Sequence, residues 1–113
     1  MTSEPMELQT RYTDTELRKV MEQGLIYMCA CPAQVAQALM KLREVHRYQM
    51  SCLQAPQNDP RVHGAIARCT ALAHATMEEC LDEVVALEKW DRATLTMPAY
   101  LRARQMREIT SDE

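Results

Sequence analysis

The chain has 113 residues and a net charge of −3, and its composition excludes several classes of protein. An acidic balance gives no overall attraction to nucleic acid or to an anionic membrane surface, so neither is an expected partner. Apolar residues make up 47% of the chain but include no Phe and only one Trp, and glycine occurs twice. This composition favours close-packed helices over a β-rich fold, in which aromatic residues, β-branched residues and turn glycines are enriched.

The sequence also predicts where the protein works. The first ten residues, MTSEPMELQT, lack the positive start and apolar core of a signal peptide, and no apolar run approaches the ~18 residues of a membrane-spanning helix. We therefore expect a cytoplasmic protein. In that reducing compartment the five cysteines are expected to be reduced thiols, several of them packed as small apolar side chains.

A Thr-x-x-Glu pattern begins the first predicted helix. Thr13 and Glu16 have the spacing of a capping box, in which each side chain accepts a hydrogen bond from the other residue's backbone N–H. We expect the helix to run from Asp14 to about Cys29. Its inner face is predicted from the residues at helical spacing: Leu17, Val20, Met21, Gly24, Leu25 and Met28.

Two longer helices are predicted on either side of the loop 55–60. The second spans about 32–54, and the third spans about 60–90, with Asp59 as its N-cap and Pro60 at its first position. The third helix has apolar residues at three-four spacing, which predicts the face that packs inward. This stripe comprises Val62, Ile66, Cys69, Ala73, Met77, Cys80, Val84 and Leu87.

Short connections between helices make consecutive helices antiparallel neighbours. A shorter and weaker helical pattern follows over 97–109. The predicted fold is therefore all-α, an up-down bundle of three long helices plus a shorter C-terminal fourth, in a single domain over 1–113. The polar residues 1–12 and 110–113 are predicted to be flexible.

The strongest candidate for chemistry is the Cys29-Ala30-Cys31 sequence between the first two helices. A hairpin that closes at the loop 55–60 puts Cys31 within a helical turn of Cys80. These three cysteines could bind a soft metal, Cu(I) or Zn, and the Cys29–Cys31 pair could instead be redox-active. The alternative is that they are packed thiols at a tight corner, with no cofactor.

Other ionisable residues fall into smaller groups. His74, Glu78 and Asp82 lie four residues apart on one helix face, which predicts a solvated row with modest pairing or, alternatively, a divalent cation site. Lys41, Arg43 and Arg47 predict a small basic patch. Neither the Glu-x-x-His pattern of di-iron bundles nor a glycine-rich phosphate loop occurs in the sequence. No catalytic residue is predicted, and enzyme activity is not supported.

Charge is unevenly distributed near the C-terminus. Six acids lie between Glu78 and Asp91 against one lysine, whereas residues 92–107 carry four arginines and no acid. One interpretation is that the basic segment folds back onto the acidic end of the third helix. The other is that an exposed arm docks on an acidic partner through Tyr100, Arg102, Arg104 and Arg107.

These patterns favour a small non-catalytic interaction or adaptor protein that acts through a helix face. Self-association as a homodimer is expected, through apolar residues at the edges of the inward stripes: Tyr27, Met40, Tyr48 and Met50. The first alternative is a soft-metal or thiol-redox protein that uses Cys29, Cys31 and Cys80. A further alternative is a regulator of a nucleic-acid machine, in which the acids of the third helix imitate a row of phosphates.

Overall fold

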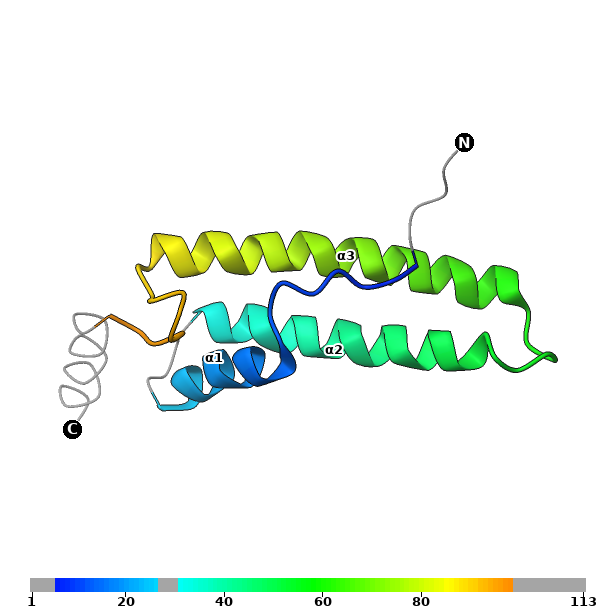
Figure 1. Ribbon diagram of the computed structural model, residues 1–113, viewed down its shortest axis with the longest axis horizontal. Coiled ribbons are helices and arrows are strands. Elements are labelled where there is room, and N and C mark those ends of the chain that lie inside the picture. The colour runs from blue at the N-terminus through cyan, green and yellow to red at the C-terminus, as the bar shows by residue number, and fades with distance from the viewer. Residues whose placement is uncertain (1–5, 27–30, 99–113) are drawn as a thin grey trace.

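The computed structural model describes residues 6–26 and 31–98, and in these residues three helices pack together (Figure 1). α1 spans Asp14–Ile26, α2 spans Cys31–Cys52 and α3 spans Pro60–Leu87. The all-α class and the three helices are thus confirmed. The expected fourth helix falls almost wholly on residues 99–109, outside the described residues. None of the three described helices has an apolar stretch long enough to cross a bilayer.

The predicted helix starts are confirmed by their hydrogen bonds. The backbone N–H of Thr13 donates to Glu16 Oε1 at 2.9 Å, and the backbone N–H of Glu16 donates to Thr13 Oγ1 at 3.0 Å, which is the reciprocal capping box. At the start of α3, the Asp59 carboxylate accepts from the backbone N–H of Arg61 at 2.9 Å, with proline at the first helical position. Local chemistry therefore fixes where α1 and α3 begin.

α2 and α3 form a long antiparallel hairpin, and α1 is too short to cover it (Figure 1). At 1.5 Å per residue, α1 is about 20 Å long, α2 about 33 Å and α3 about 42 Å. α1 begins beside the middle of α2, where Asp14 Oδ1 lies 2.6 Å from Arg43 Nη1, and runs back along the first half of α2. We call the part beyond α1 the uncovered half of the hairpin: residues 44–52 of α2 and 60–73 of α3.

The hydrophobic core lies in the covered half. It combines α1, the first half of α2, the last turns of α3 and the turn that follows α3, in which Asp91 and Thr96 form an isolated antiparallel bridge. Its buried members are Tyr12, Leu17, Val20, Ala33, Ala36, Leu39, Leu81, Val85, Trp90, Leu95 and Met97. The uncovered half instead buries small or polar residues: His46, Gln49, Gly64, Ala67, Thr70 and Ala71.

Candidate functional site

Residues 6–13, which we call the strap, run alongside α2 and α3 before α1 begins (Figure 1). The Glu78 carboxylate on α3 accepts hydrogen bonds from the backbone N–H of Arg11 at 2.8 Å and of Tyr12 at 3.2 Å. From α2, Arg43 donates to the Tyr12 carbonyl at 2.6 Å, and His46 donates to the Met6 carbonyl. A segment expected from its composition to be flexible is therefore bound through its backbone by both long helices.

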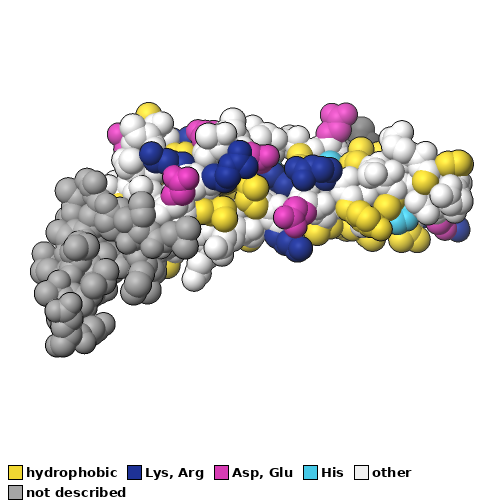
Figure 2. All heavy atoms as spheres, turned by 90° about the horizontal axis from the view of Figure 1, so that it is seen from below, with side chains coloured by type: hydrophobic (Ala, Val, Ile, Leu, Met, Phe, Trp, Pro, Cys, Tyr) yellow, Lys and Arg dark blue, Asp and Glu magenta, His cyan; other side chains and the backbone are white. Residues whose placement is uncertain are grey.

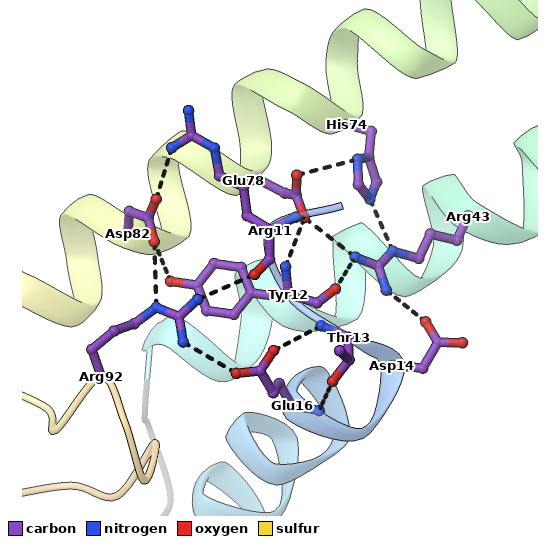
Figure 3. Close-up of polar contacts among 10 residues, drawn as sticks. All are labelled: Arg11, Tyr12, Thr13, Asp14, Glu16, Arg43, His74, Glu78, Asp82 and Arg92. Carbon is purple, nitrogen blue, oxygen red and sulfur yellow. Dashed lines mark hydrogen bonds and ion pairs between the residues drawn. The ribbon is translucent and has the colours of Figure 1, made fainter. Parts of the chain in front are cut away.

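Arg43 is the centre of this polar network, and only 7% of its side chain is exposed (Figure 3). Besides the Tyr12 carbonyl, its guanidinium contacts Glu78 Oε2 at 3.3 Å and Asp14 Oδ1 at 2.6 Å, and it donates from Nε to His74 Nε2 at 2.9 Å. One side chain thus joins α1, α2, α3 and the strap. The prediction that Arg43 belongs to a basic surface patch is wrong, because two carboxylates and a backbone carbonyl take up its charge.

The contact with Arg43 fixes the protonation state of His74. A guanidinium Nε–H can only donate, so His74 Nε2 must accept, and the proton of the neutral ring resides on Nδ1. That atom faces Glu78 Oε1 at 3.8 Å. Burial lowers the pKa of His74; the Glu78 carboxylate opposes this shift and the Arg43 charge adds to it. His74 is therefore held as a neutral acceptor.

A second group of contacts lies around Asp82, one turn further along α3 (Figure 3). Its carboxylate accepts from the Tyr12 hydroxyl at 2.5 Å and from Arg11 at 2.9 Å. Arg92 lies over the Tyr12 ring at 4.0 Å from its centroid and donates to Glu16 at 3.2 Å. Burial opposes ionisation of Asp82, but the hydrogen bonds from Tyr12 and Arg11 outweigh it and lower its pKa. Arg92 also lies 3.8 Å from Asp82. The other arginines of the basic segment lie outside the described residues, so its folding back onto α3 stays a prediction.

The prediction that His74, Glu78 and Asp82 form a solvated row is therefore wrong. The side chains of His74 and Glu78 are 0% and 1% exposed. The four-residue spacing was visible in the sequence, but nothing local indicated that the strap and Arg43 would cover this face. His74 and Glu78 are inaccessible, whereas Asp14 and Arg43 of the same network line an open groove beside the strap. The physical role of the network is to fix how α1, α3 and the strap sit on α2.

The prediction that the apolar stripe of α3 packs inward is the one that the structure corrects most. The buried face of α3 lies elsewhere around the helix, on Gly64, Ala67, Ala71, His74 and Glu78. The buried positions toward the start of α3 are small residues, and the network buries His74 and Glu78. Within the stripe no residue is buried: Met77, Cys80 and Val84 are partly exposed, and the others are exposed, namely Val62, Ile66, Cys69, Ala73 and Leu87.

This stripe and the adjacent row of α2 form what we call the open face: Ala38, Leu42, Val45, Val62, Ile66, Cys69, Ala73, Met77 and Cys80. An open groove runs along it, where Leu42 of α2 meets Ile66, Cys69 and Ala73 of α3. Four large exposed side chains of the two helices lie in the uncovered half: Tyr48, Val62, Ile66 and Leu72. Figure 2 shows hydrophobic side chains gathered toward the hairpin-loop end of the molecule.

The predicted cysteine site is only partly described. Cys31 is exposed at the first residue of α2, Cys80 is partly buried on α3, and Cys29 lies outside the described residues. Within residues 6–26 and 31–98, no three His, Cys, Asp or Glu side chains are grouped so that they could hold a metal ion. A site that includes Cys29 stays a prediction.

Metal content tests that prediction directly. If Cys29, Cys31 and Cys80 bind Cu(I) or Zn, protein purified without chelator should contain about one metal ion per chain, and Cys31→Ser should lose it because one of three thiolate ligands is gone. Elemental analysis of both proteins measures this. Cys69→Ser is the matched control, because Cys69 lies about three turns from Cys80 along α3. Equal metal content in all three proteins would contradict the site.

The predicted partner-binding residues occupy different positions. Tyr48 is 65% exposed in the uncovered half. Met50 is partly buried and lines a groove between the strap and α2, together with Leu8 and Arg47. Met40 packs against the edge of the core. The remaining candidates lie outside the described residues: Tyr27, Tyr100, Arg102, Arg104 and Arg107.

Comparisons with models of protein families, with curated proteins and with solved structures find no match for this chain. A function must therefore be inferred from the structure itself. Its two distinctive features are the open face and the polar network beside it.

Proposed function

We propose that this protein is a non-catalytic interaction protein that binds another protein chain through the open face of the α2–α3 hairpin. The supporting observation is that the most regular apolar stripe of α3 is exposed from Val62 to Ala73, whereas Met77 and Val84 further along pack against the edge of the core. A helix of a soluble protein ordinarily buries such a stripe, and large exposed apolar patches mark binding surfaces. Each large aliphatic side chain that a partner buries contributes about 1.5–3 kcal/mol.

The polar network supports this proposal by making the face rigid. Arg43 and Glu78 fix the rotation of α3 against α2, so the stripe is presented in one orientation before any partner arrives. A pre-ordered surface loses less conformational entropy on binding than a flexible one. The alternative that the acids of α3 imitate a row of phosphates has less support, because Glu78 is buried and Asp82 is paired with Arg11.

A photo-crosslinking experiment tests the proposed function. A photoreactive amino acid at Ile66, which is 38% exposed on the open face, should give a discrete protein adduct in cells that contain the chain. The matched control places the same group at Leu72, which is 54% exposed on the same helix but lies about 120° around it from Ile66. The Leu72 position should give little adduct. Equal yields at both positions, or no adduct at Ile66, would contradict binding through the open face.

A further inference from the structure

We infer that the occupant of the open face is a second copy of this chain, docked about a two-fold axis so that two α2–α3 hairpins form a four-helix bundle. This inference rests on the proposed function, and it names the partner. The spacing of the exposed residues, the size of the face and its lack of charge carry the argument.

The spacing of residues indicates a helical partner. Both helices carry a three-four row on this side, the repeat that places side chains along a helix–helix contact. In a four-helix bundle such rows point toward the bundle axis. Here two helices present them. Val35, Met77 and Val84 pack against the edge of the core, and most of the other positions are exposed or only partly buried. The α2 row is Val35, Ala38, Leu42, Val45, Gln49 and Cys52, of which Gln49 alone is buried, and the α3 row is the stripe defined above.

The size of the face suits a second hairpin. With the α2 row from Val35 to Cys52 about 25 Å long and two helices about 20 Å wide, the face projects roughly 500 Å² per chain. A stable interface of standard size buries about 800 Å² of accessible surface per partner. One further helix would cover only part of this width, whereas a second α2–α3 hairpin has the same length and width.

Charge and symmetry favour a copy over an unrelated chain. In a two-fold contact, residues near the axis meet their own counterparts, so a charge there would face an identical charge. The open face contains no charged residue. At its edge, Lys41 pairs with Glu44 of its own chain at 3.3 Å and needs no partner charge. An antiparallel helix pair also has an approximate two-fold axis perpendicular to its face, which lets two such pairs dock with matched ends.

Small side chains at the middle of the face allow the two hairpins to approach closely. Ala65, Cys69, Thr70 and Ala73 line the groove, with Leu42 and Ile66 as its larger members. Packed helices separated by 8–10 Å require such a mixture of small and large side chains. Cys69, which is exposed in the single chain, would become covered in the dimer.

Sedimentation equilibrium of the purified full chain tests the inference. The wild-type protein should dimerise with increasing concentration, and Ile66→Glu should weaken the dimer roughly a hundredfold or more, because a carboxylate would be buried against apolar atoms. Leu72→Glu, the matched control, should dimerise like the wild type. In parallel, Cys69 of the wild type should react more slowly with a thiol reagent at high protein concentration, and that protection should be absent in Ile66→Glu.

Two results would contradict the inference that a second copy occupies the open face. One is a wild-type chain that stays monomeric at all concentrations while Ile66 crosslinks to a different protein; the proposed function would then survive and its partner would not be a second copy. The other is a dimer that Ile66→Glu leaves intact with Cys69 unprotected, because the contact would then use another surface. If the chain is monomeric and Ile66 gives no adduct, the proposed function fails as well.

Discussion

Glu78→Ala should lower the free energy of unfolding by about 3–5 kcal/mol, the cost of removing one partner from a buried ion pair. The substitution leaves Arg43 with only Asp14 as a carboxylate partner, and 43% of the Asp14 side chain is exposed to water. It also removes the acceptor of two backbone N–H groups of the strap, at Arg11 and Tyr12. Urea unfolding followed by circular dichroism and by the fluorescence of the single Trp90 measures the change.

The matched control for this prediction is Glu79→Ala, one residue along the same helix. Glu79 is exposed, so its removal should change stability by no more than about 0.5 kcal/mol. Glu78→Gln keeps the side-chain volume and one acceptor oxygen, and it should fall between the two if Glu78→Ala is too unstable to measure. Equal effects of the Glu78 and Glu79 substitutions would show that the network does not hold the fold together.

Helix positions were predictable because their signals are local. The capping box at Thr13 and Glu16, and the Asp59-Pro60 start of α3, each act within one turn of chain. The approximate register of the hairpin also followed from a short loop between two long helices. It was predicted to bring Cys31 within a helical turn of Cys80, and along the same hairpin the structure pairs Arg43 with His74.

The buried face of α3 was not predictable from apolar spacing, because tertiary contacts overrode it. The rule equates the most apolar stripe with the core, yet the helix buries Gly64, Ala67 and Ala71 together with an ion-paired glutamate. Burying Glu78 is tolerable because Arg43 and two backbone N–H groups bind its Oε2, while its Oε1 faces His74 Nδ1 at 3.8 Å. Those partners come from elsewhere in the chain, so no window of sequence around α3 contains the signal.

The polar network could not be predicted from local sequence either. Its contacts join residues 66 and 67 positions apart between the strap and Glu78, and 31 apart between Arg43 and His74. A proline-containing polar N-terminus gave no sign that Tyr12 would be fully buried. The exposed stripe is the opposite case: its residues were predicted to be buried and are exposed or partly exposed. Because the network takes the inward position on α3, apolar residues that suit a core are left on the surface, available to a second chain.

Acidification should destabilise the fold beginning near pH 6.5, the ordinary pKa of histidine. Burial lowers the pKa of His74 in the folded chain, so below pH 6.5 the unfolded chain binds a proton that the folded chain does not. His74 therefore contributes stability that is complete above pH 6.5 and is lost as pH falls through its folded pKa. The slope is up to about 1.4 kcal/mol per pH unit for one proton.

The strap is where this loss should appear first. A protonated His74 can no longer accept from Arg43, and it places a second cation against the buried guanidinium. The protection of the Tyr12 amide against hydrogen exchange, relative to the intrinsic exchange rate at each pH, should therefore fall below pH 6.5 before global unfolding, because Glu78 binds this N–H. The lowered pKa values of Asp14 and Asp82 add further loss only at lower pH, near the range of ordinary carboxylates.

His74→Gln separates the histidine from the carboxylates. Glutamine keeps an acceptor oxygen for Arg43 but cannot titrate, so the variant should lose the slope that begins at pH 6.5 and keep the loss in the range of ordinary carboxylates. A titration of His74 by NMR gives the pKa directly, and a value at or above 6.5 would contradict the argument. Because Arg43 donates to His74 and also binds Glu78 and the strap carbonyl, a neutral His74 is required for all three contacts to coexist.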